Sequence, residues 1–191
     1  DDTEVINPRW LTQMVGFLQI EGVGCVGAKL LFPNNQVQHA GVIHGLASGF
    51  PGTAFRNQPR ENAGYLNYLR TPRNYSAVTA ACMLTTRKLF LELGGFDQQE
   101  FAVAYNDIDF CYRLISSGKR CVYSPDAMLY HHEGSSRGFT DNLSELAAFK
   151  IKYRDFKDSF YNPNLSLENH NFEVSPRRIP YPVKKPLRVL A

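Results

Sequence analysis

The spacing of hydrophobic residues alternates along the chain between a helical period and short strand-like runs. Trp10, Met14 and Leu18 recur at helical spacing. Asn7 and Pro8 precede them, and Asn is favoured as an N-cap while Pro is tolerated at the first helical position. The pattern therefore predicts a helix that starts with Asn7 as its N-cap.

Two apolar runs follow this helix and predict a hairpin. The first predicts a strand over residues 25–32 and the second a returning strand over residues 36–43, with Pro-Asn-Asn as the turn at residues 33–35. Residues 44–74 hold glycines, prolines and polar side chains without a clear period. They predict a long loop that could include a short helix, and loops of this length in a compact domain are usually functional.

The next part of the chain reads as strands and helices in turn. Residues 77–84 are an apolar run of strand length, and residues 86–93 predict a short helix that two glycines end. Residues 107–117 predict a further helix, because their apolar side chains fall on one face. Short strands are predicted over residues 120–123 and 127–132.

One more helix precedes a tail. Asn142 and Glu145 have the spacing of a capping box and predict a helix that reaches about Phe156. The regular pattern is lost from Asn162 onward, where prolines recur. We therefore expect a domain over residues 1–160 and an extended, Pro-rich basic tail or linker over residues 161–191 that leads towards a further domain.

Charge is unevenly distributed between these parts. The chain carries 21 basic and 18 acidic side chains, a formal net charge of +3. Residues 176–191 contain five of the basic residues and no acid, so residues 1–175 hold 16 basic and 18 acidic side chains, a net charge of −2. A mildly acidic domain argues against nucleic acid as a partner. No stretch of sequence approaches the roughly 20 apolar residues that cross a bilayer.

The cysteine spacing excludes two classes of small stabilised domain. Cys25, Cys82, Cys111 and Cys121 each sit in an apolar run, and none forms a Cys-x-x-Cys pair. A zinc knuckle or a disulfide framework requires different spacing. Buried, reduced thiols of a cytoplasmic protein are the favoured interpretation.

Two acidic clusters are candidates for chemistry. Asp1 and Asp2 lie where a strand would end, just before the first helix, and Mg²⁺ and Mn²⁺ prefer carboxylate oxygen. The alternative is that both acids simply interact favourably with the dipole at a helix N-terminus.

The second cluster opens the helix over residues 107–117. Arg113 lies four residues after Asp109, a spacing that favours an ion pair on one helix face. Asp109 and Arg113 are therefore predicted to support the structure, which leaves Asp107 free to accept a proton from a hydroxyl group. Either aspartate could instead cap the helix.

A histidine pair follows on a predicted strand. His131 and His132 are neighbours and point to opposite faces of that strand, so only one of them can face a site. The His-Glu-x-x-His motif of zinc proteases is absent. His39 and His44 have no partner that the sequence identifies, and their role stays open.

The loop after the histidines is polar. Ser135, Ser136 and Arg137 offer two hydroxyls, backbone N–H groups and a guanidinium, which suit a diphosphate. Taken alone, such a sequence is an ordinary loop. Its position directly after the histidine pair favours a role at a site.

Ordered motifs run along residues 1–150. They are Asp-Asp-Thr-Glu-Val-Ile-Asn-Pro-Arg-Trp-Leu, then Val-Gly-Ala-Lys-Leu-Leu-Phe-Pro and Val-Gln-His-Ala-Gly-Val. Leu-Gly-Gly-Phe-Asp, Asn-Asp-Ile-Asp-Phe-Cys-Tyr-Arg-Leu and Tyr-His-His-Glu-Gly-Ser-Ser-Arg-Gly follow. In this order they resemble the family-2 glycosyltransferases, and most of all the bacterial rhamnosyltransferase-like branch that builds cell-surface polysaccharides.

The resemblance implies an α/β fold, namely the C-terminal portion of a GT-A (nucleotide-diphospho-sugar transferase) fold with a mixed sheet flanked by helices. It also implies inverting sugar transfer and a Mg²⁺ or Mn²⁺ ion held by an Asp-x-Asp motif and a later histidine. Asp2 matches the last aspartate of that motif, Asp1 its middle position and His131 the histidine.

The remaining functional positions also follow from the resemblance. Asp107 matches the general base, with Asn106 beside it in contact with substrate, and Arg137 with Ser135 and Ser136 matches a mobile loop over the diphosphate. The implied partners are a nucleotide-diphospho-sugar donor and a saccharide or lipid-linked saccharide acceptor. A lipid-linked acceptor would bring a cytoplasmic protein to the inner face of the membrane.

One departure from the family changes the expectation. The family's strands that bind the base and ribose precede the Asp-x-Asp motif, and no such strands precede Asp1 here. We therefore expect an inactive fragment, the acceptor half of a GT-A domain, with acceptor selection in the aromatic loop over residues 44–74. A non-catalytic carbohydrate-binding or scaffolding module and a metal-dependent hydrolase are the alternatives. Retention of Asp2, Asp107 and His131 argues against the first, and the lack of a further His/Asp cluster against the second.

Overall fold

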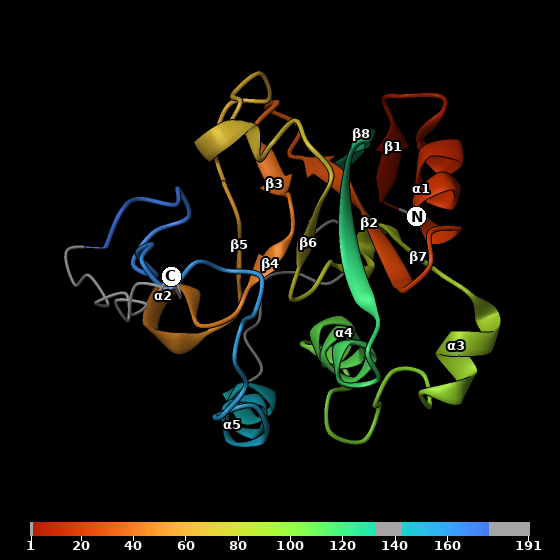
Figure 1. Cartoon of the computed structure of the whole chain (residues 1–191), viewed down its shortest axis with the longest axis vertical. Coiled ribbons are helices and arrows are strands. Elements are labelled where there is room, and N and C mark those ends of the chain that lie inside the picture. The colour runs from red at the N-terminus through yellow and green to blue at the C-terminus, as the bar shows by residue number, and fades with distance from the viewer. Residues whose placement is uncertain (1, 133–142, 176–191) are drawn as a thin grey trace, which may run out of the picture.

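The computed structural model describes residues 2–132 and 143–175. In this part of the chain a mixed sheet of six strands has β2 (Val23–Leu31) and β8 (Arg120–His131) side by side and parallel (Figure 1). The four shorter strands pair antiparallel with these two. They are β1 (Thr3–Val5) and β6 (Arg73–Tyr75) on β8, and β3 (Val37–His39) and β7 (Met83–Thr85) on β2.

Helices cover both faces of the two long strands. On one face α1 (Trp10–Leu18) buries Met14 against Val26 and its neighbours. On the other face α4 (Asn106–Ser116) packs on β2 and β8, with α5 (Leu143–Lys152) next to it (Figure 1). Alternate residues of β2 face opposite helices, as strand geometry requires. The predicted α/β class, a mixed sheet flanked by helices, is confirmed.

The C-terminal half of strand β8 extends from the core of the sheet to the N-terminal strand β1. β6 pairs with residues 121–123 of β8, and β1 pairs with residues 129–131. His131 is thereby placed opposite Thr3, directly beside Asp2. The two short strands expected over residues 120–123 and 127–132 are one strand, and its register against β2 shifts between Ser124 and Met128.

The first helix starts later than its sequence predicts. α1 begins at Trp10 with Arg9 in the N-cap position and no side-chain cap. The Asn7 side chain accepts a hydrogen bond from the Arg9 N–H at 3.0 Å and donates one to the carbonyl of Asp126 at 2.7 Å. The N-cap prediction for Asn7 is therefore wrong, because this residue closes a turn before the helix and ties it to β8.

The predicted hairpin is confirmed, but its second strand is shorter than expected. β3 ends at His39, and the chain then turns away at Gly41 to form β4 (Val42–Ile43), which pairs with β5 (Gly52–Thr53). Gly41 has a φ of +101°, a conformation that only glycine adopts readily.

A substitution at Gly41 tests whether the turn after β3 requires a glycine. A Cβ atom at residue 41 would lie 2.1 Å from the Tyr75 ring, so Gly41→Ala combines a clash with backbone strain. We expect it to lower the free energy of unfolding by about 2–4 kcal/mol in urea denaturation. Gly118→Ala is the matched control, because Gly118 has a φ of +83° but no atom within 4 Å. Gly118→Ala should lower the free energy of unfolding by only about 1 kcal/mol. Equal losses for the two variants would exclude the clash with Tyr75 as a cause.

The strand predicted over residues 77–84 is mostly absent. Thr79 caps a 3-10 turn, η2 (Ala80–Cys82), and only β7 is extended and paired with β2. The prediction failed because a short apolar run indicates that its residues are buried, and burial alone does not require them to pair as a strand. The helix expected next is confirmed as α3 (Arg87–Glu92), with Thr86 as its N-cap.

The long segment over residues 44–74 does contain a short helix, α2 (Leu46–Gly49), and also a 3-10 turn, η1 (Tyr65–Asn67). Its aromatic side chains pack inwards, since Tyr65 stacks on Phe172 and Tyr68 contacts the same ring edge-on. Residues of the C-terminal part join the same core, namely Tyr161, Leu165 and Phe172. The boundary expected near residue 160 therefore does not coincide with the edge of the packed core.

The last described helix is shorter than predicted. α5 ends at Lys152 and not near Phe156. Asn142 of the expected capping box lies outside the described residues. The carboxylate of Glu145 accepts hydrogen bonds from the N–H groups of Val103 and Ala104, the latter at 2.6 Å. This residue therefore holds the loop that leads into α4.

Three of the four cysteines form a buried cluster, as their apolar surroundings predict. Cys25 and Cys121 are neighbours on β2 and β8, and Cys111 faces them from α4. All four cysteines are free thiols, and Cys82 is half-buried. The three buried sulfurs lie within 4.8 Å of one another and pack among Val78, Phe110 and Leu114. They behave as small apolar core residues.

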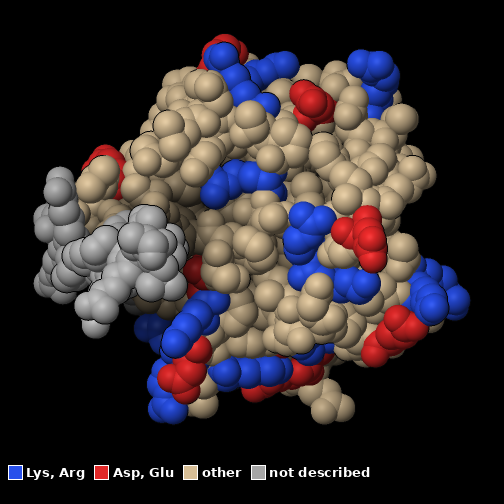
Figure 2. All heavy atoms as spheres, viewed as in Figure 1, with Lys and Arg blue, Asp and Glu red and all other residues tan. Residues whose placement is uncertain are grey.

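Charged side chains of both signs lie next to one another on the face drawn in Figure 2. Lys152, for example, pairs with Glu100 at 2.6 Å and with Asp97 at 3.4 Å. Among the helices of the described residues, none combines the length and apolar character needed to cross a membrane.

Candidate functional site

The structure brings the predicted metal ligands Asp2 and His131 together. The Nε2 atom of His131 lies 3.4 Å from the Oδ2 atom of Asp2, and both side chains are only partly exposed. The neighbouring His132 points elsewhere and pairs with Glu4 at 3.6 Å. Only one histidine of the pair faces Asp2, as the alternation along a strand predicts.

The chemistry of this pair fits a hard divalent cation. Two cis ligands of an octahedral ion with bonds of about 2.1 Å lie about 3 Å apart, close to the separation of Asp2 and His131. A carboxylate oxygen suits Mn²⁺ or Mg²⁺, and an imidazole nitrogen is a ligand of first-row transition ions, so the pair suits Mn²⁺ better than Mg²⁺. Asp1, which would be a further contact, lies outside the described residues. If the His131 imidazole is protonated, the same geometry serves as an ion pair.

A small pocket of about 120 Å³ begins at His131. Its lining side chains are polar or charged and come from the strands around β3 and from the turn before η2: Gln38, His39, Thr53, Arg56, Thr79 and His131. The pocket thus lies between His131, the predicted metal ligand, and the turn at Thr79, which leads to the contact with α4.

Asp107 lies at the other end of this segment. Its Oδ2 atom accepts a hydrogen bond from the Ala80 N–H at 2.9 Å, and its Oδ1 atom accepts one from the Ile108 N–H at 2.8 Å. Thr79, which lines the pocket, also hydrogen-bonds the carboxylate. Burial raises the pKa of Asp107 above its ordinary value, although these hydrogen bonds oppose the shift. A carboxylate with a raised pKa beside a polar pocket is suited to proton transfer.

His39 ties the pocket to the segment that holds Asp107. Its Nε2 atom accepts hydrogen bonds from the N–H groups of Gly41 at 3.2 Å and Thr79 at 3.4 Å. Burial, together with the neighbouring His131 ring and the Arg56 guanidinium, lowers the pKa of His39 to about 3. His39 therefore remains a neutral acceptor at physiological pH, which answers the question that the sequence left open.

Asp109 and Arg113 form the predicted supporting ion pair. Asp109 is fully buried, and its Oδ2 atom accepts a hydrogen bond from Arg113 Nε at 2.7 Å. Arg113 also donates to the carbonyls of Leu93 and Gly95. This pair fixes the Leu-Gly-Gly turn against α4 and contacts neither Asp107 nor the pocket lining.

The remaining predicted residues are not brought into the site by the described structure. Asn106 is the first residue of α4 and is half-buried. Ser135, Ser136 and Arg137 lie outside the described residues, so their contact with a diphosphate stays a prediction.

Sequence reasoning missed Gln38, Thr53, Arg56 and Thr79 as pocket residues. Gln38 accepts a hydrogen bond at 2.7 Å from His131 Nδ1 and is buried. No residue motif marks these positions, because the contacts join segments that are far apart in sequence. The unassigned His39 was the one available signal, since a histidine beside a glutamine in an apolar strand needs polar partners.

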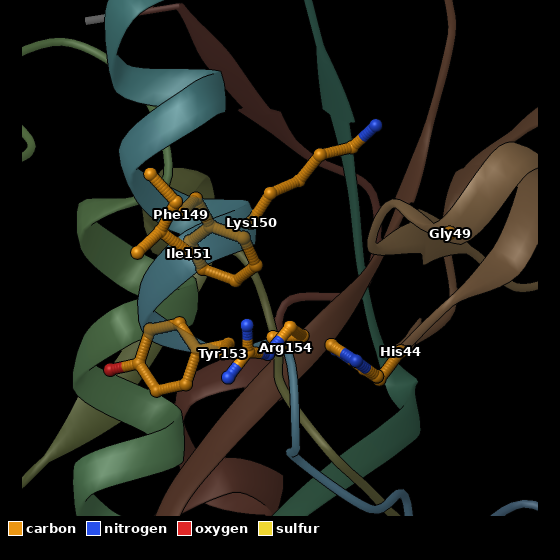
Figure 3. Close-up of a pocket in the computed structure, with 7 residues that line it drawn as sticks. All are labelled: His44, Gly49, Phe149, Lys150, Ile151, Tyr153 and Arg154. Atoms are coloured by element: carbon orange, nitrogen blue, oxygen red, sulfur yellow. The ribbon is translucent and has the colours of Figure 1, made fainter.

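A larger pocket of about 430 Å³ lies between α5 and His44 (Figure 3). Figure 3 shows His44 across the pocket from the α5 side chains. His44 donates its N–H to Asp158 and hydrogen-bonds the Tyr112 hydroxyl at 2.9 Å. None of the predicted catalytic or metal-binding residues lines this pocket. His44 therefore has a structural role in the core around α4.

The chain is similar in sequence to several known proteins. The model of the glycosyltransferase-like family 2 matches residues 1–147. The Sinorhizobium fredii protein y4gI is 46% identical over 187 residues, which cover 93% of this chain and 20% of y4gI. The O-antigen biosynthesis protein RfbC of Myxococcus xanthus is 38% identical over 175 residues, or 87% of this chain and 13% of RfbC.

A third similarity is shorter. The N-acetylglucosaminyl-diphospho-decaprenol L-rhamnosyltransferase of Mycobacterium tuberculosis is 38% identical over 71 residues, which cover 37% of this chain and 22% of that enzyme. The chain thus spans about a fifth or less of the length of these relatives. The family model covers well over half of the chain and all of the described site residues. The chain therefore belongs to the glycosyltransferase-like family 2.

Proposed function

We propose that this chain contributes the acceptor side and part of the metal site of an inverting glycosyltransferase of cell-surface polysaccharide biosynthesis. The observation that carries the proposal is one continuous set of contacts. Asp2 faces His131 at one end of a polar pocket, and the turn at Thr79 leads from that pocket to Asp107. Such an arrangement connects a cation-binding pair and a carboxylate base through one polar pocket and the turn at its edge.

Each residue has a chemical role in this proposal. Asp107 accepts the proton of the acceptor hydroxyl, which makes that oxygen a better nucleophile towards the anomeric carbon. Attack from the side opposite the leaving nucleoside diphosphate inverts the configuration. The N–H of Ala80 holds the Asp107 carboxylate in place, so the base does not need to reorganise during the reaction.

Asp2 and His131 would hold a Mg²⁺ or Mn²⁺ ion together with the donor phosphates. When bound, such an ion neutralises charge on the leaving diphosphate. The relatives named for O-antigen biosynthesis and for L-rhamnosyl transfer support a nucleotide-diphospho-sugar donor and a saccharide or lipid-linked acceptor. A nucleotide-diphospho-L-rhamnose is the first donor to test.

A transfer assay with histidine variants tests the metal assignment. The assay is run on a longer form of the protein as well as on this chain, because the chain covers only a fifth of y4gI and less of RfbC. We expect EDTA to abolish transfer, Mn²⁺ or Mg²⁺ to restore it, and His131→Ala to lower it by about 10²-fold or more. His132→Ala is the matched control, since its side chain pairs with Glu4 on the other face. Full activity of His131→Ala would contradict the assignment.

We further propose that this chain alone binds the donor weakly or not at all. Isothermal titration calorimetry of the 191-residue chain with a sugar nucleotide and Mn²⁺ tests this. Tight binding that depends on Mn²⁺ would show that the chain contains a complete donor site.

A further inference from the structure

Strand β3 contains an irregularity at Gln38. Leu30 of β2 pairs with His39, whereas the next residue, Leu31, pairs with Val37, so Gln38 has no partner of its own in the ladder. In a regular strand neighbouring side chains point to opposite faces. Here Gln38 and His39 both line the pocket at His131. Bulges of this kind re-aim a side chain and are frequent beside active sites.

The re-aimed amide contacts His131 twice. Gln38 Nε2 donates to the main-chain carbonyl of His131 at 3.3 Å, and Gln38 Oε1 lies 2.7 Å from His131 Nδ1. The carbonyl can only accept, so it fixes which end of the amide carries the hydrogens. The oxygen end of the amide must then face Nδ1.

This orientation determines the state of the imidazole. An oxygen acceptor at 2.7 Å requires that Nδ1 carry the hydrogen. In a neutral imidazole the other nitrogen then has a free lone pair, and Nε2 is the atom that faces Asp2. Gln38 is itself buried, which shields this hydrogen bond from water.

We infer that Gln38 is a positioning residue, which holds His131 in the tautomer and orientation that leave Nε2 ready to bind a divalent cation beside Asp2. The inference rests on the proposed function for the identity of the ligand, but the tautomer itself does not. A partner that fixes the second nitrogen of a ligating histidine typically contributes 10–100-fold to metal affinity.

The first measurement needs no metal. In ¹⁵N-resolved NMR spectra of the 191-residue chain, recorded at a pH where the imidazole is neutral, we expect the His131 ring to carry its hydrogen on Nδ1. His131→Ala assigns the signals. Gln38→Leu removes the acceptor and should shift the ring towards the Nε2–H form. A wild-type ring that already carries its hydrogen on Nε2, or a tautomer unchanged in Gln38→Leu, would overturn the inference.

The second measurement titrates Mn²⁺ and follows the paramagnetic broadening of the same His131 signals. Gln38→Leu should require about 10–100-fold more Mn²⁺ for equal broadening. Gln38→Glu keeps an oxygen acceptor and should restore the wild-type response. Gln98→Leu at an exposed position is the matched control and should change nothing.

The two measurements separate failure of the inference from failure of the proposed function. If Mn²⁺ does not broaden the wild-type His131 signals, the metal assignment fails. The comparison of the His131 tautomer between the wild type and Gln38→Leu then still tests whether Gln38 positions the ring. If Mn²⁺ broadens wild type and Gln38→Leu equally, the metal assignment stands and Gln38 is not a positioning residue.

Discussion

Asp107→Asn is expected to lower the transfer rate by about 10²–10⁴-fold while donor binding is retained. The amide keeps an oxygen that can accept the Ala80 N–H but cannot take a proton from a hydroxyl. The measurement is the single-turnover rate together with the donor Kd. Asp155→Asn, at a side chain 89% exposed, is the control that should leave the rate unchanged.

The same variant separates catalysis from folding. Because burial raises the pKa of Asp107, the folded state binds the proton more tightly than the unfolded state does. The stability of the wild type therefore falls as the pH rises from the unfolded pKa through the folded one. Asp107→Asn lacks this penalty but loses one of the two acceptors for the Ala80 and Ile108 N–H groups, so its melting temperature at neutral pH should stay close to that of the wild type. If Asp107→Asn melts at a much lower temperature than the wild type, destabilisation of the fold would explain its lost activity.

The pH profile of the wild type provides an independent check on this base. Asp107 must be ionised to accept a proton, so kcat/KM should fall on the acid side at a pH above the ordinary aspartate pKa of about 3.9. An acid limb at or below that value would contradict a base whose pKa is raised.

Asp109→Ala is expected to lower the free energy of unfolding by about 3–5 kcal/mol. Asp109 is fully buried and ties α4 to the end of α5, since it also accepts a hydrogen bond from the Tyr153 hydroxyl at 2.5 Å and lies 3.0 Å from Lys152 Nζ. Its removal leaves the cations of Arg113 and Lys152 without their buried partner. Urea denaturation monitored by circular dichroism measures the loss.

The control for Asp109 is again the surface pair of Arg154 and Asp155, whose side chains are both more than 80% exposed. Asp155→Ala should change the free energy of unfolding by less than about 0.5 kcal/mol. Equal effects of Asp109→Ala and Asp155→Ala would show that burial of the pair contributes nothing.

Features that depend on local spacing could be predicted from the sequence. The helix at Asp107, the ion pair of Asp109 with Arg113, and the short helix after Thr86 all follow from patterns within a few residues along the chain. Strand alternation likewise predicted that only one of His131 and His132 can face a site. Family motifs then supplied the pairing of Asp2 with His131, which lie far apart in sequence.

Features that depend on distant segments could not be predicted. The apolar run over residues 77–84 has strand composition, yet the Asp107 carboxylate and the Thr79 cap favour a turn there. The bulge at Gln38 arises from how β3 meets β2 and leaves no mark in the hydrophobic pattern. Tyr75, just after the segment expected to select the acceptor, is buried against Gly41 because that glycine provides the space.

The parallel pairing of β2 with β8 has a consequence for the order of folding. β2 is complete at Leu31, but its parallel partner begins only at Arg120, so roughly 90 residues must be synthesised before the central ladder closes. Until then β2 presents an apolar strand with an open edge, the kind of surface that associates with other chains. Pairings across such a separation also fold slowly. Co-expression with a chaperone should therefore improve the soluble yield more than any single stabilising substitution at the surface.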